Sequence, residues 1–154
     1  MIEIIEVRLI EGELLTLLEE HMVDMYNTSP PENVHTLDRS ALKQPDVTFW
    51  RAELNNSLVG CIALKELSHV HGEIKSMRTQ HTARQQGVGS ALLAHTIDTA
   101  RARGYHKLSL ETGSMAFFKP ARRLYKRFDF QYCPPFAHYT LDANSLFMCL
   151  QLID

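Results

Sequence analysis

The chain has 154 residues, of which 45% are hydrophobic and 22% charged, and this composition is ordinary for one globular domain spanning residues 1–154. Lysine and arginine total 16 against 18 aspartates and glutamates, so no nucleic-acid partner is expected, because binding a phosphate backbone needs a basic surplus. No apolar run approaches the ~20 residues of a membrane span, so no membrane partner is expected either.

The first half of the chain is expected to form a strand, two helices and a hairpin. β-Branched residues predict a strand over 2–10, and apolar residues at helical spacing predict an amphipathic helix over 12–27. A second, short helix is expected over 35–42. Strands are expected over 47–54 and 58–67, and the Asn-Asn pair between them predicts the tight turn of a hairpin.

The second half alternates strands and helices. A strand is expected over 73–79, followed by a polar loop and a strongly amphipathic helix over 87–103 that Gly104 ends. A fifth strand is expected over 105–110. A further helix is expected to end near Phe128, since apolar residues before it recur at helical spacing.

Two closing strands are expected over 130–132 and 145–152, separated by an irregular stretch at 133–144. The element order therefore predicts an α/β (α+β) sandwich with a mixed sheet in one domain. The three cysteines are scattered, eight histidines show no metal-ligand spacing, and the N-terminus lacks a basic segment typical of a signal peptide. A cytoplasmic protein with free thiols and no metal is expected.

One loop before the long helix carries the chemistry, and its residues are Arg84, Gln85, Gln86, Gly87, Val88, Gly89 and Ser90. The first turn of a helix leaves backbone N–H groups unpaired, and the helix dipole makes that end positive. Glycines let an anion approach the backbone, and Arg84 adds donors suited to phosphate. The loop predicts a pyrophosphate site, although an ordinary glycine-containing turn at the start of a helix is the alternative.

The pattern Arg84-x-x-Gly87-x-Gly89 resembles the signature of the GNAT acyltransferase superfamily, and a second stretch, A-x-x-L-Y-K-x-F-x-F over 121–130, resembles another family element. Element order extends the resemblance over most of the chain. It implies a GNAT-like fold with a central mixed, mostly antiparallel sheet of about seven strands and about four helices. The C-terminal residues are similar to those of a small bacterial subgroup of acetyltransferases.

Four positions depart from the family pattern. Asp129 and Gln85 stand where glycine is usual, and His81 stands where many members have proline. Phe118 replaces an asparagine, so a hydrogen bond that this asparagine makes to the cofactor is in doubt.

The resemblance implies an N-acetyltransferase that uses acetyl-CoA as co-substrate. Backbone groups of Met77, Arg78 and Thr79 would contact the acyl-pantetheine arm, with the Met77 N–H facing the thioester carbonyl. Tyr125 matches the family tyrosine and is the candidate general acid; the alternative is a core tyrosine on an apolar helix stripe.

Glu73 is the candidate general base, because it stands four residues before Met77, where some family members place a catalytic glutamate. Burial there would raise its pKa towards neutrality. The alternatives are a solvated strand residue paired with Lys75, the second candidate Glu111, or a chain of waters.

The implied acceptor is a primary amine of a small molecule or peptide, attacked directly in a ternary complex. Family members commonly form homodimers, so a dimer is an expectation of the resemblance. A non-catalytic acyl-CoA-binding module of the same fold, or an unrelated phosphate-binding domain, are the alternatives. The basic helix face of Arg122, Arg123, Lys126 and Arg127 is either solvated or contributes one contact to the ribose phosphate of CoA.

Overall fold

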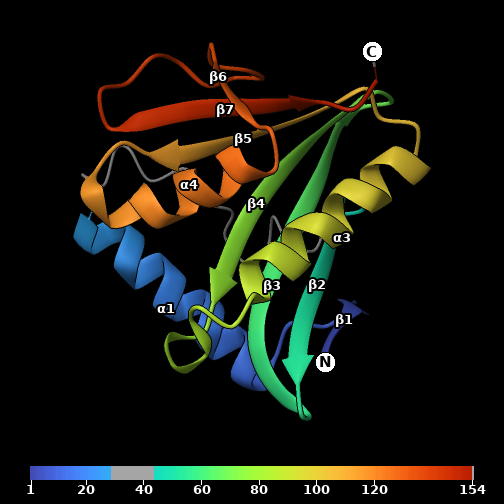
Figure 1. Ribbon diagram of the computed structural model, residues 1–154, viewed down its shortest axis with the longest axis vertical. Helices are drawn as coiled ribbons and strands as arrows, with labels where there is room; N and C mark the ends of the chain where they lie inside the picture. The colour runs from blue at the N-terminus through green and yellow to red at the C-terminus, as the bar shows by residue number, and fades with distance from the viewer. Residues whose placement is uncertain (29–43, 154) are drawn as a thin grey trace.

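The computed structural model describes residues 1–28 and 44–153 (Figure 1). The short helix expected over 35–42 lies outside the described residues. The strands are β1 Ile2–Val7, β2 Val47–Leu54, β3 Ser57–Ser68, β4 His71–Thr79, β5 Lys107–Gly113, β6 Gln131–Cys133 and β7 Ser145–Gln151. The helices are α1 Gly12–Thr28, α3 Val88–Ala102 and α4 Lys119–Arg127, with 3-10 turns η2 His81–Ala83 and η3 Ala116–Phe118. No helix in these described ranges is long and apolar enough to cross a membrane.

The seven strands form one sheet in the order β1-β2-β3-β4-β5-β7-β6. Every neighbouring pair is antiparallel except β4 and β5, which are parallel, so the expected mixed and mostly antiparallel sheet is confirmed. The described part of the chain contains three α-helices, and the remaining one of the about four expected lies outside the described residues. The fifth strand runs later than expected, because Glu111, Thr112 and Gly113 continue its pairing with β7.

Helices cover both faces of the sheet (Figure 1). On one face α3 and α4 pack on the larger core, to which Ile62 and Leu64 of β3 contribute. On the other face α1 packs on a smaller core that contains Cys61 and Ala63 of the same strand. Successive strand residues point to opposite faces, so this alternation divides β3 between the two cores.

The parallel strands β4 and β5 pair over a short distance and then separate, as Figure 1 shows. Their register begins at His71 opposite Lys107 and ends at Ile74 opposite Leu110. Just beyond that point β4 carries a bulge, because Cys61 and Ala63 of β3 pair with Arg78 and Lys75 and leave two residues of β4 between them. The sheet is therefore open between β4 and β5 from Ile74 onwards.

Gln85 and Asp129, where the resemblance leads us to expect glycine, both adopt the left-handed conformation. The φ angle is +66° at Gln85 and +72° at Asp129. Asp129 follows α4, and the N–H groups of Asp129 and Phe130 bond to the carbonyls of Lys126 and Tyr125 at 3.0 and 3.1 Å, which closes the helix. Both positions therefore have a backbone conformation that favours glycine, although neither residue is one.

Asp129→Gly is expected to raise the free energy of unfolding by up to about 1 kcal/mol, because glycine removes the steric cost of φ +72° and a carboxylate from a helix C-terminus. Urea unfolding measures the change. Asp98→Gly in exposed, right-handed α3 backbone is the matched control and is expected to destabilise the protein slightly. Loss of stability in Asp129→Gly would contradict the account.

Candidate active site

A cavity of about 110 Å³ occupies the opening between β4 and β5. Its lining combines residues from α1, β4, β5, α4 and the segment before β7. The lining residues are His21, Glu73, Ile74, Lys75, Ser76, Met77, Glu111, Thr112, Gly113, Phe118, Ala121, Tyr125 and Tyr139. The structure therefore brings three sequence-predicted site residues, Glu73, Met77 and Tyr125, to one pocket, together with the second candidate base.

The pocket receives side chains from both faces of the sheet. Tyr125 belongs to the core under α3 and α4, as does Ile74. Glu73 and Lys75 flank Ile74 along β4, so they point to the opposite face, where α1 lies. Separation of the two strands is what lets groups from opposite faces meet, since a continuous sheet would keep them apart.

Glu73 is buried, with 2% of its surface exposed, and the interpretation of it as a solvated strand residue is wrong. The expected pairing with Lys75 is present, with Nζ 3.3 Å from Oε2. The hydroxyl of Tyr139 also donates a hydrogen bond to Oε2 at 2.7 Å. Sequence analysis placed Tyr139 in an irregular stretch and missed this contact, because the two residues are 66 positions apart and no local pattern links them.

Tyr125 is a core residue that also borders the pocket. Its ring lies 5.9 Å from that of Phe130, and burial raises the pKa of its hydroxyl. Within residues 1–28 and 44–153 no hydrogen bond satisfies this hydroxyl. A phenol that stays protonated and unengaged beside a cavity can donate a hydrogen bond to a molecule bound there.

His21 of α1 is a lining residue that sequence analysis did not single out. Burial, and secondarily the Arg78 guanidinium, lower its pKa to about 4, so the imidazole is neutral near pH 7. The Arg78 side chain pairs with Asp24 of α1. That ion pair turns the Arg78 side chain towards α1. The contact expected between Arg78 and the acyl-pantetheine arm involves only its backbone, so the ion pair does not exclude it.

The predicted pyrophosphate loop joins η2 to α3 and is exposed at 84–87. Gly87 is the N-cap residue of α3 with φ +81°, and no side chain caps this end. A Cβ at Gly87 would meet nothing within 4 Å, so the backbone conformation alone, and not lack of space, explains this glycine. A Cβ at Gly89 would lie 2.9 Å from Leu124 Cδ2, so this glycine lets α3 pack closely on α4 beside Tyr125.

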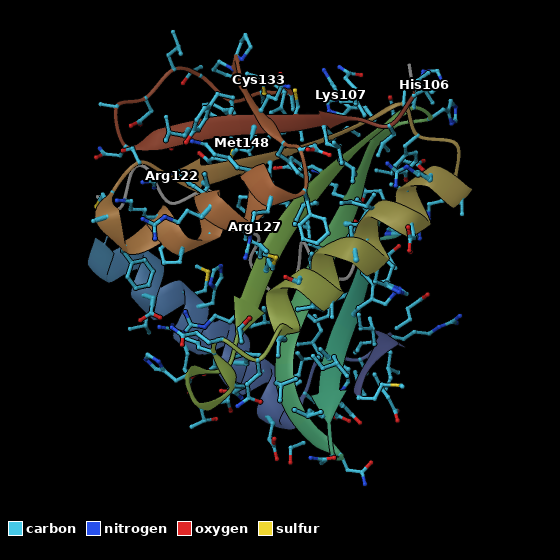
Figure 2. The ribbon with its side chains drawn as sticks, viewed as in Figure 1. His106, Lys107, Arg122, Arg127, Cys133 and Met148 are labelled. Atoms are coloured by element: carbon cyan, nitrogen blue, oxygen red, sulfur yellow. The ribbon has the colours of Figure 1, made fainter. Side chains whose placement is uncertain are left out.

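The basic face of α4 is not uniformly solvated. Arg122 Nη1 donates to the carbonyls of Gly113 and Met115 at 2.6 and 3.0 Å, which ties α4 to the end of β5. Lys126 lies over the ring of Tyr132. Arg123 and Arg127 are exposed, and Figure 2 shows Arg122 and Arg127 along the helix. No cluster of potential metal ligands occurs among the described residues.

The fold and the pocket define a class of α/β protein with an open, mixed sheet and a helix whose N-terminus no side chain caps. Residues 14–130 match the model of the Acetyltransferase (GNAT) family. The chain belongs to this family, and it is an acyltransferase.

Curated relatives agree with that assignment. The chain is 51% identical to the uncharacterized N-acetyltransferase YsnE of Bacillus subtilis over 91% of this chain and 93% of the relative. It is 44% identical to the uncharacterized N-acetyltransferase YedL of Escherichia coli, covering 90% and 87%. An Azospirillum brasilense protein named IAA acetyltransferase is 37% identical, covering 88% and 86%.

Solved structures support the fold. A Klebsiella pneumoniae structure described as an acyl-CoA N-acyltransferase superposes with a TM-score of 0.79 at 27% identity, covering 99% of both chains. A GNAT family acetyltransferase from Elizabethkingia anophelis, solved with acetyl-CoA bound, gives a TM-score of 0.68 at 19% identity, covering 97% of both chains. At that lower identity the likeness concerns the fold alone.

Proposed function

We propose that this protein transfers an acetyl group from acetyl-CoA to a primary amine of a small molecule or peptide, by direct attack in a ternary complex. One observation carries the proposal: Glu73 and Tyr125, from opposite faces of the sheet, line one cavity in the opening between β4 and β5. Amine acylation is helped by one group that accepts the proton of the amine and one that donates a proton to the leaving thiolate, and a carboxylate and a phenol can fill these two roles.

The residues around the opening suit acetyl-CoA, which supplies the acyl group as an activated thioester. Arg84 and the uncapped first turn of α3 would hold the diphosphate. Met77, Arg78 and Thr79 lie on β4 beyond its last pair with β5, where their backbone groups would meet the pantetheine arm. Ser76 lines the cavity, and its buried Oγ has no hydrogen-bond partner among the described residues.

The groups around the cavity then have distinct roles. An alkyl amine has a pKa of ~10.4 and arrives protonated, so Glu73 accepts its proton, directly or through water. The Met77 N–H stabilises negative charge at the acyl oxygen. Tyr125 donates its hydroxyl proton to the sulfur of the departing CoA thiolate. His21 is neutral and Glu111 lies in the same lining, so either can bind the acceptor by hydrogen bonds.

A thiol-release assay with acetyl-CoA and a panel of primary amines tests the proposal. We expect amine-dependent release of free CoA and a product heavier by one acetyl group in mass spectrometry. CoA binding without turnover on any amine would instead identify a non-catalytic acyl-CoA-binding module. The proposal extends to a cytoplasmic homodimer, for which light scattering should give twice the chain mass.

Arg84→Ala is expected to weaken CoA binding by about tenfold to a hundredfold, because a charge-assisted hydrogen bond to phosphate contributes roughly 1.5–3 kcal/mol. Titration calorimetry with CoA measures the loss. Arg101→Ala, at the far end of α3, is the matched control and should bind CoA as the unchanged protein does. Equal affinity in both variants would remove Arg84 from the proposed site.

A further inference from the structure

The buried carboxylate of Glu73 is held through one oxygen. Tyr139 donates to Oε2 at 2.7 Å, and Lys75 Nζ lies 3.3 Å from the same atom. Lys75 also donates to the Tyr139 hydroxyl at 2.8 Å, so the three groups form a closed ring of contacts. Within residues 1–28 and 44–153, no hydrogen-bond partner lies on Oε1.

The direction of these hydrogen bonds is fixed by chemistry. An ammonium group has no acceptor capacity, so Lys75 must donate to the Tyr139 oxygen. The single hydroxyl proton of Tyr139 is then directed to Glu73. Burial, together with the charge of Glu73, raises the pKa of Tyr139, so the hydroxyl keeps its proton at working pH.

The ring of Tyr139 is itself fixed by aromatic packing. Its centroid lies 5.1 Å from that of Phe136 and 5.6 Å from that of Phe147 on β7. The ring of His138 stacks on it at 5.0 Å. A side chain packed on several sides loses rotamer freedom, so its hydroxyl can hold the carboxylate in one position.

We propose that Tyr139 is a positioning residue for the transfer reaction. Through Oε2 it fixes the Glu73 carboxylate so that Oε1 faces the cavity and receives the proton of the acceptor amine. Lys75 completes the arrangement by orienting the tyrosine hydroxyl. The inference rests on the proposed function, because it assigns Tyr139 a role through the candidate base and not through contact with substrate.

Tyr139→Phe keeps the packed ring and removes the hydroxyl. We expect kcat to fall about tenfold to a hundredfold, because the lost bond is to a charged group. The KM for the amine and the Kd for CoA should change by less than about twofold, since the ring that lines the cavity is kept and the lost hydroxyl is bonded to Glu73 and Lys75. Tyr132→Phe removes a hydroxyl from exposed β6 and is the matched control, with kcat unchanged.

A double-mutant cycle separates positioning from a general structural role. In a Glu73→Gln background, Tyr139→Phe should lower kcat by less than about twofold, because the base through which it acts is already gone. An equal fall in both backgrounds would overturn the inference, as would unchanged kcat in Tyr139→Phe where Glu73→Gln is impaired. Failure of the unchanged protein on every amine would instead overturn the proposed function.

A crystal structure of Tyr139→Phe gives a readout that does not depend on activity. The Glu73 carboxylate is expected in a displaced rotamer or in several. An unchanged, single rotamer of Glu73 would overturn the positioning role whatever the enzyme does in solution.

Discussion

Tyr125→Phe is expected to lower kcat by about 10²–10⁴-fold, the usual contribution of a general acid, and to leave CoA binding unchanged. The substitution keeps the ring in the core against Phe130 and removes only the hydroxyl that borders the cavity. Burial raises the pKa of that hydroxyl, so it is present as a donor throughout the working pH range. Steady-state kinetics with acetyl-CoA and an active amine measure kcat, and calorimetry measures the Kd for CoA.

Tyr105→Phe is the control for loss of a buried hydroxyl. Tyr105 is 2% exposed, and its hydroxyl donates to Glu66 at 2.7 Å, outside the lining of the cavity. This variant is expected to lose some stability and keep its kcat. If the Tyr125→Phe variant kept its kcat as the Tyr105→Phe variant is expected to, Tyr125 would be a core residue without a catalytic role.

Glu73→Gln is the second change with a large expected effect, a loss of about 10²–10⁴-fold in kcat through removal of the base. It also leaves the Lys75 ammonium, 8% exposed, beside a neutral partner. Breaking a buried ion pair costs roughly 3–5 kcal/mol, so the variant should unfold at lower temperature. Kinetics must therefore be measured well below its Tm.

Glu66→Gln is the matched control, since it makes the same change in a carboxylate that accepts from Tyr105. Its kcat should equal that of the unchanged enzyme. A large loss in Glu111→Gln with a small one in Glu73→Gln would transfer the base role to Glu111. Small losses in both variants would point to a chain of waters.

Much of the fold could be predicted because its signals are local. The strand expected over 47–54 coincides with β2. Asn55 and Asn56 after it adopt φ of +52° and +66°, as a tight hairpin turn requires. Gly104 ends α3 with φ +83°. The predicted bounds were less accurate for a strand buried on both faces. The fifth strand was expected over 105–110, and it runs from Lys107 to Gly113.

The candidate site was predictable for the residues that stand in recognisable motifs, and not for all the residues that complete its lining. Arg84, Gly87 and Tyr125 stand in recognisable patterns, and the structure places Tyr125 with Glu73 at one cavity. Tyr139 and His21 approach that cavity through packing of distant segments, which no periodicity encodes. The close packing that favours glycine at position 89 could not be predicted either, because it depends on Leu124 of another helix.

Strands β4 and β5 pair over a short stretch only, so the sheet consists of two sub-sheets joined by this one parallel pairing. In the described part of the chain, the register from His71 to Ile74 on β4 is the only strand pairing between β1 to β4 and the trio β5, β7 and β6. The Val70 carbonyl extends it by accepting hydrogen bonds from the N–H groups of His106 and Lys107. A ligand that bridges the gap adds contacts between the two sub-sheets. Substrate binding is therefore expected to raise the free energy of unfolding of the protein.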